Sequence, residues 1–219
     1  MKKTAVCMAA AALVLTALLG GCAAEESFTA QTYTAEGEVV SVSIDVSDRA
    51  VEVAPSEDGK LHIAYYESEK QSYKIELTGE GALTVQLDLD REWTDFIGTQ
   101  AAVEYRTIRV ELPSDLTTLS VVTTNENVTM SDVTVSESVS VSVNGGDISF
   151  GKISVGTSLS LTVKNGNITG SVAGGWDDFT IDCAVKKGES TLPEHKDGGS
   201  KTLSVDCNNG DVTIDLANA

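Results

Sequence analysis

The chain has 219 residues and is strongly acidic, with 33 Asp and Glu against 15 Lys and Arg and a formal net charge of −18. This balance argues against nucleic-acid binding, because such affinity depends on neutralising phosphates with Lys and Arg. Aromatic residues make up only 5% of the chain, and a body rich in Val, Ser, Thr and Gly favours strands over helices.

The N-terminus has the pattern of a secretory signal. Lys2 and Lys3 precede an apolar run that ends in Leu19-Gly-Gly-Cys22. The run is shorter than the ~20 residues that a membrane-spanning helix needs. Its end resembles the lipobox of bacterial lipoproteins, which implies that residues 1–21 are removed and that Cys22 carries a diacylglyceryl group. An ordinary secretory peptide with an incidental cysteine is the alternative.

Lipidation of Cys22 predicts a protein anchored to the cell membrane on its extracytoplasmic face, since two acyl chains hold a protein there stably. Removal of residues 1–21 takes away two lysines and no acidic residue, so the mature net charge becomes more negative by two. Residues 22–37 are polar and lack a pattern, which predicts a spacer between the lipid and the folded part.

Residues 38–112 form a less regular β region. Candidate strands are 39–46, 50–53, 61–66, 72–77, 83–89 and 107–112. They fit either worn repeats of the solenoid predicted below or a sheet that caps it. Arg91 to Tyr105, with Trp93 and Phe96, breaks the rhythm and predicts a loop or short helix on the core, with an exposed contact site as the alternative. Pro113 marks a boundary between this region and residues 113–219.

Residues 113–219 repeat a short alternating segment. The segments begin at Leu119, Val139, Leu159, Phe179 and Leu203, which are 20, 20, 20 and 24 residues apart. Corners rich in Asn and Gly follow most of them, and a second short strand follows each corner. This order predicts a parallel β-solenoid with coils of about 20 residues, in an all-β protein. An antiparallel hairpin array is the competing interpretation.

These residues together resemble a known family. The segments Ala50–Ser56, Leu61–Tyr65, Glu92–Ile97 and Ile108–Pro113, the Asn-Gly repeats and the closing Asn209–Leu216 are similar to the bacterial "putative adhesin" family. That family is a domain of unknown function common in Gram-positive envelope proteins. The resemblance covers about residues 38–217 and implies one β-solenoid-like domain in the envelope, with no catalytic residues.

The chain offers few groups for chemistry. Motifs of zinc hydrolases, serine hydrolases and phosphate-binding loops are absent from the sequence, and its two histidines, His62 and His195, are expected on the surface. No cofactor and no confident metal site are predicted.

Four residues near the C-terminus are the remaining candidates. Cys183 and Cys207 are predicted at the same inward position of consecutive coils, either as a disulfide or as buried free thiols. Asp182 and Asp206, which precede them, are predicted to stack outward as weak ligands for Ca²⁺.

The sequence favours a non-enzymatic cell-surface lipoprotein, an adhesin or envelope-associated binding and scaffold module. Its partners would be the membrane, through the lipid, and a cell-wall glycan or surface protein, which flat Ser- and Thr-rich faces suit. One alternative is an accessory in envelope-stress signalling. Another is a β-helix carbohydrate-active enzyme, with Asp182, Asp206 and Lys186 or Lys187 in a groove.

Overall fold

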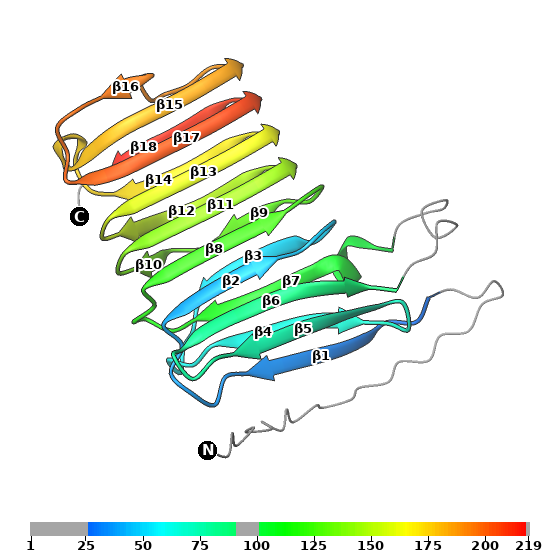
Figure 1. Cartoon of the computed structure of the whole chain (residues 1–219). Coiled ribbons are helices and arrows are strands. Elements are labelled where there is room, and N and C mark those ends of the chain that lie inside the picture. The colour runs from blue at the N-terminus through cyan, green and yellow to red at the C-terminus, as the bar shows by residue number, and fades with distance from the viewer. Residues whose placement is uncertain (1–25, 91–100, 218–219) are drawn as a thin grey trace, which may run out of the picture.

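The computed structural model describes residues 26–90 and 101–217, and these form an all-β, solenoid-like stack (Figure 1). Two nine-stranded sheets make up the walls of the stack within these ranges. Sheet A has the order β1 (Thr29–Thr34), β4 (His62–Glu67), β7 (Thr107–Leu112), β3 (Ala50–Pro55), β9 (Val128–Met130), β12 (Ile148–Val155), β14 (Ile168–Ala173) and β18 (Val212–Ala217), with β10 (Val133–Val135) beside β12. Sheet B has the order β16 (His195–Lys196), β15 (Phe179–Lys187), β17 (Lys201–Asn209), β13 (Ser158–Asn165), β11 (Ser138–Gly145), β8 (Thr118–Thr123), β2 (Ser41–Asp45), β6 (Ala82–Leu89) and β5 (Gln71–Leu77).

A coil consists of one strand of sheet B, a corner and one strand of sheet A. Successive coils pair in parallel, with Leu119 opposite Val139 and Val139 opposite Leu159. The predicted parallel solenoid with coils of about 20 residues is therefore confirmed. The hairpin array is wrong for this part of the chain, because neighbouring strands of the repeat run in the same direction.

The core lies between the two sheets and is made by the alternation of each strand. Leu159, Leu161 and Val163 are fully buried, whereas Ser160 and Thr162 face outward, as the two-residue period predicts. Fully burying a side chain of this size contributes about 1.5–3 kcal/mol. A small aliphatic core with few rings is sufficient because every coil repeats this burial.

Polar corner side chains keep the coils in register. The backbone N–H of Asp147 donates to Asn127 Oδ1 at 2.8 Å, and that of Asn167 donates to Asp147 Oδ1 at 2.7 Å. The ladder continues from Asp211 N to Asn167 Oδ1 at 2.9 Å and from Glu189 N to Asp211 Oδ1 at 2.9 Å. Each carboxylate or amide satisfies a donor of the next coil, which the turn itself leaves unpaired.

The last step of that ladder shows that the coils do not stack in chain order. Strand β17 lies between β13 and β15, so the C-terminal coil is an interior coil and β15 lies at the end. After β14, the 3₁₀ turn Trp176–Asp178 carries the chain past one coil position, and β17 and β18 return to fill it (Figure 1). The order of the coils along the stack therefore differs from their order along the chain.

The edge strand β18 is also covered. The Thr191 N–H donates to the Val212 carbonyl at 2.9 Å, and the Thr191 hydroxyl exchanges hydrogen bonds with the backbone of Ile214 at 2.9 and 3.0 Å. The loop between β15 and β16 thus satisfies groups that a bare sheet edge would expose.

The N-terminal region contains both of the structures that its pattern allowed. Strands β2 and β3 continue the stack, with Val42 opposite Leu119 and Val51 opposite Val128, and β6 with β7 adds another coil beyond them. Strand β4 pairs antiparallel with β7, and β5 pairs antiparallel with β6, so that these two strands cap the parallel coils at this end. Each of the two sheets thus contains strands from both sides of Pro113, and neither sheet is interrupted there.

Strand β1 lies within residues 22–37, so the prediction that this whole segment is a spacer without structure is wrong. It pairs antiparallel with all six residues of β4, from Thr29 opposite Glu67 to Thr34 opposite His62. The polar, alternating sequence of this segment suits an edge strand that needs little burial, which is why it shows no core pattern.

Several predicted features fall on residues that the structure does not describe. Cys22, Trp93 and Phe96 are among them, whereas Val103–Arg106 forms a short 3₁₀ helix, η2. Within residues 26–90 and 101–217, no helix has both the length and the apolar character that crossing a bilayer requires.

Candidate functional site

The outer surface of sheet B carries rows of small hydroxyl side chains, which we name the hydroxyl face. Their buried neighbours point into the core, so alternation directs the hydroxyls outward. One row is Ser43, Ser120, Ser140, Ser160 and Ser204, and the next is Ser41, Thr118, Ser138, Ser158 and Thr202. Neighbouring strands lie about 4.8 Å apart, and the two rows about 7 Å apart.

The hydroxyl face is uncharged and can both donate and accept hydrogen bonds. Each Ser or Thr offers one O–H donor and two acceptor lone pairs. The repeat of the coils places these groups at regular intervals along the stack. Such an array can bind an extended polar chain through many weak contacts.

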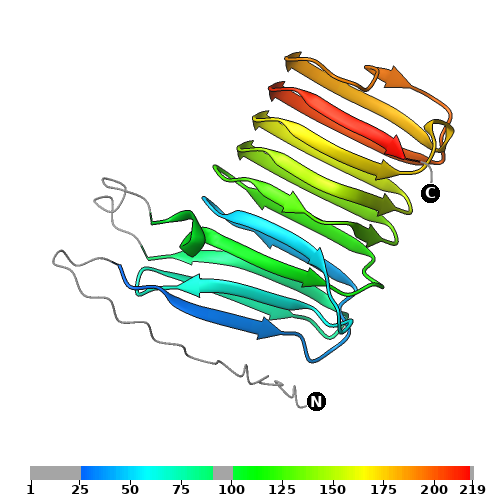
Figure 2. The same ribbon diagram turned by 180° about the vertical axis from the view of Figure 1, so that it is seen from behind.

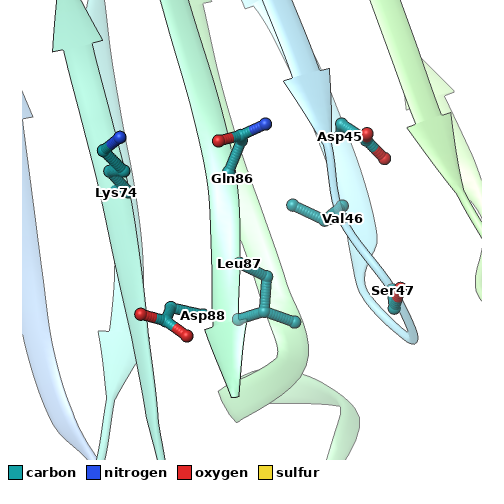
Figure 3. A pocket seen from close by; sticks show the side chains of 7 residues that line it. All are labelled: Asp45, Val46, Ser47, Lys74, Gln86, Leu87 and Asp88. Atoms are coloured by element: carbon teal, nitrogen blue, oxygen red, sulfur yellow. The ribbon is translucent and has the colours of Figure 1, made fainter.

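A hollow of about 450 Å³ lies on sheet B where β2 turns away from β6 (Figure 3). Lys74, Gln86 and Asp45 are directly opposite one another on β5, β6 and β2. Lys74 also pairs with Glu76 at 3.1 Å. The remaining lining residues are Val46, Ser47, Leu87 and Asp88.

This hollow combines two carboxylates, an amide, an ammonium group and an apolar floor. These groups suit a small polar ligand. The sequence analysis missed it because β2 and β6 are far apart in the chain, and no motif joins them.

A second hollow, of about 500 Å³, lies at the other end of sheet B and contains the predicted aspartates. Asp182 lies opposite Ser204, whereas Asp206 lies opposite Ala184 and Thr162. The predicted stacking of the two aspartates is therefore wrong by two residues along the strand. The cause is that Phe179 pairs with Lys201 rather than with Leu203, and a shift of two preserves the alternation that the sequence shows.

Asp182 pairs with a histidine instead of a second aspartate. His195 Nδ1 donates to Asp182 Oδ1 at 2.7 Å, and Nε2 lies 3.2 Å from Asp197 Oδ2. The hydrogen bond to Asp182 and then that to Asp197 raise the pKa of His195 above its ordinary value. His195 is exposed, as predicted.

Across the residues that the structure describes, no group of three or more His, Cys, Asp and Glu side chains is arranged to hold a metal ion. His62 is half-buried rather than fully on the surface, and it bonds Asp58 and Thr34, both at 2.9 Å. The hydrogen bond with His62 is the main reason that the pKa of Asp58 is lowered.

The same register separates the two cysteines. Cys183 lies opposite Val205, and Cys207 lies opposite Val185. An offset of two residues on adjacent strands puts their Cα atoms about 8 Å apart, beyond the ~7 Å that a disulfide can bridge without backbone movement. The predicted equal position is wrong, and both thiols are buried and free in this structure.

Each thiol has local partners of its own. Cys207 Sγ donates to the Gly210 carbonyl at 3.3 Å, and Cys183 Sγ lies 3.4 Å from Ser190 Oγ. Desolvation by burial, followed by the charge of Asp206, raises the pKa of Cys207. A higher pKa keeps the thiol protonated and unreactive.

These observations define a class: an all-β domain of two stacked sheets with polar outer faces and shallow polar hollows. The chain belongs to the DUF4097 family, described as Toastrack, whose model matches residues 39–215. The resemblance to a β-solenoid-like adhesin domain of unknown function is thereby confirmed.

The chain is similar to solved structures at low sequence identity, and the first of them shares its fold. A "putative cell adhesion protein" from Clostridium sporogenes is 10% identical, with a TM-score of 0.60 over 87% of this chain and 100% of that chain. A "putative adhesin" from Bacteroides fragilis is 13% identical, with a TM-score of 0.42 over 88% of this chain and 98% of that one. No curated protein matches the chain. None of these descriptions names an enzymatic activity.

Proposed function

We propose that the protein is a non-enzymatic lipoprotein, anchored through Cys22 on the extracytoplasmic face of the cell membrane, whose hydroxyl face binds an extended glycan of the cell envelope. The observation that carries the proposal is the row of aligned serines from Ser43 to Ser204 on five adjacent parallel strands. A polysaccharide presents hydroxyls at regular intervals, and it can bond to such a row without a deep pocket.

The adhesion names of the structural neighbours agree with a binding role, and the strongly acidic composition suits a neutral or cationic partner better than an anionic one. The glycan hypothesis is preferred over a β-helix enzyme because Asp182 and Asp206 are offset and Asp182 pairs with His195.

Binding to isolated cell-wall polysaccharide, measured by calorimetry, tests the proposed face. The variant Ser140→Ala with Ser160→Ala removes two facing hydroxyls of sheet B. Each hydrogen bond contributes about 0.5–1.5 kcal/mol, so the Kd should rise by roughly 5-fold to 150-fold.

The matched control is Ser149→Ala with Thr169→Ala, which removes two facing hydroxyls from the outer surface of sheet A. The control should bind as the unmodified protein does. Equal losses in both variants would refute the assignment of the face, and no binding by the unmodified protein would refute the glycan proposal.

The anchor has its own test. Mass spectrometry of the mature N-terminus should show a diacylglyceryl group on Cys22, and Cys22→Ser should move the protein from the membrane fraction to the soluble fraction. An unmodified Cys22 in membrane-derived protein would refute the anchor.

A further inference from the structure

The segment from Glu26 to Thr34, which we name the strap, is fastened to the folded domain along its length. Glu26 Oε1 accepts hydrogen bonds from the Ser68 hydroxyl and from Gln71 Nε2, the latter at 3.0 Å. The strap thus bonds the turn between β4 and β5 before it pairs with β4 as strand β1.

A buried arginine lies behind that contact. Arg49 is 1% exposed, and its Nη2 donates to Gln71 Oε1. Its other acceptors among the described residues are neutral, including the Tyr73 hydroxyl at 2.8 Å and the Asp48 carbonyl at 2.9 Å. The Gln71 amide therefore connects the carboxylate of Glu26 to a buried guanidinium, which favours keeping Glu26 in place.

Aromatic stacking fastens the next part of the strap. The ring of Phe28 stacks on that of Tyr105, with centroids 4.7 Å apart and planes within 4° of parallel. Tyr66 contacts Tyr105 edge to face at 5.2 Å. Tyr105 is 36% exposed and Val103 is 53% exposed, so this apolar cluster remains open to its surroundings.

These contacts leave almost no chain between the lipidation site and the folded domain. Three residues, Ala23 to Glu25, separate Cys22 from Glu26. Four steps of extended chain span at most about 14 Å, whereas the predicted spacer of residues 22–37 would have reached about 55 Å. The headgroup layer on one side of a bilayer is itself about 5–8 Å thick.

We propose that Phe28, Tyr66, Val103 and Tyr105, named here the foot, rest at the phospholipid headgroups. The stack is thereby held with its β1 end against the membrane and its β15 end away from it (Figure 2). The inference rests on the proposed lipidation of Cys22. Tyrosine suits this layer, where apolar ring surface meets water and polar headgroups, and Phe28 adds ring surface beside Tyr105. The short tether supplies the proximity, because the acidic chain gains no attraction from anionic lipids.

Fluorescence quenching in vesicles tests the foot. Lipidated full-length protein carrying Val103→Cys or Asp177→Cys is labelled with an environment-sensitive probe and reconstituted into phosphatidylcholine vesicles, with or without a nitroxide quencher on the lipid headgroups. Asp177 lies in the 3₁₀ turn Trp176–Asp178 beside the far end of the stack, and the buried Cys183 and Cys207 react slowly in both proteins. The Val103 probe should lose fluorescence in vesicles that carry the quencher, and the Asp177 probe should not.

A variant with a longer tether distinguishes the effect of tether length on quenching from the effect of a disturbed fold. Ten Gly and Ser residues inserted between Ala24 and Glu25 touch no contact described above and add about 17 Å of mean reach. Quenching of the Val103 probe should then fall toward that of the Asp177 probe, whereas lipidation and flotation with vesicles stay unchanged.

The outcomes distinguish the inference from the anchor on which it depends. A protein that floats with vesicles and carries the lipid, but whose Val103 probe is not quenched, overturns the foot and leaves the anchor standing. Quenching that survives the insertion overturns the argument from tether length. A protein that neither carries the lipid nor floats overturns the anchor and the foot together.

Discussion

Gly166 is a corner residue pressed between two coils, and its replacement by alanine tests how closely the coils must approach. Its φ is +149°, and a Cβ built there would lie 2.0 Å from the Gly146 carbonyl oxygen and 2.6 Å from its carbon. On the other side, its N–H donates to the Asn209 carbonyl at 2.9 Å. The obstructing atoms are backbone, so the clash is relieved only if the coils separate.

The free-energy cost follows from these contacts. Strain at a backbone conformation reserved for glycine costs about 1–3 kcal/mol, and weakening one inter-coil hydrogen bond adds about 0.5–1.5 kcal/mol. Gly166→Ala should therefore lower the free energy of unfolding by about 3 kcal/mol. In a domain of this size, that corresponds to a fall in Tm of about 6–12 °C.

Gly59→Ala is the matched control. Gly59 also has a positive φ, +75°, but nothing lies within 4 Å of a Cβ placed there. It should cost only about 1–2 kcal/mol, the penalty of the left-handed conformation. Urea unfolding followed by circular dichroism measures both variants. Equal destabilisation of the two would refute the role assigned to the close approach of the coils.

Three other perturbations address the core, the histidine pair and the order of the coils. Leu161→Ala should cost about 2–5 kcal/mol in urea unfolding, because Leu161 is fully buried, whereas Ser160→Ala on the hydroxyl face should stay within about 0.5 kcal/mol. Asp182→Asn should lower the pKa of His195 toward its ordinary 6.5 in an NMR titration. The small stabilisation from this pair is present below pH 6.5 and is lost as the pH rises through the raised pKa, so the variant should weaken that dependence. A chain ending before Lys201 lacks β17, the strand that joins β15 to the rest of sheet B, so β15 and β16 should lose their amide protection in hydrogen exchange while the stack from β1 to β14 keeps it; full protection of β15 in the truncated chain would contradict the coil order.

The repeated part of the fold could be predicted because its signal is local. The alternation within Leu159 to Val163 sets which side chains face the core, and the spacing from Leu119 to Leu159 sets the coil. The outward serines follow from the same alternation, so the hydroxyl face was within reach of the sequence. The hollow around Gln86 was not, since it depends on a pairing between β2 and β6 that no local pattern records.

The register at the C-terminal end shows the limit of that reasoning. Pairing Phe179 with Leu203 or with Lys201 buries the same kind of side chain on the same face, because the two alignments differ by a whole period of the strand. The sequence therefore placed Cys183 and Cys207 on the inward face correctly but aligned them wrongly. The strap was missed for another reason: its hydrogen bonds and its ring stack involve residues more than 40 positions away.

The chain follows the same path at both ends of the stack. After β2 and β3, the chain leaves one coil position open, forms β4 and β5 outside it, and returns as β6 and β7 to fill the gap. After β13 and β14, it forms β15 and β16 outside and returns as β17 and β18. In sheet B, each outermost segment is thus a mid-chain excursion that includes an antiparallel pair, β5 with β6 at one end and β15 with β16 at the other.

This arrangement addresses a hazard that parallel solenoids share. A terminal coil left at the end of a stack can fray, and its open edge can pair with another molecule. Here the sheet B strand of each returning coil, β6 or β17, is paired on both sides, so it cannot separate without breaking strand pairs with two neighbours. If the proposed lipid anchor concentrates the protein on a membrane, many copies would meet there and the need would be greatest. On the proposed short tether, the outer faces of the two sheets, rather than the paired ends of sheet B, would be the surface available for binding.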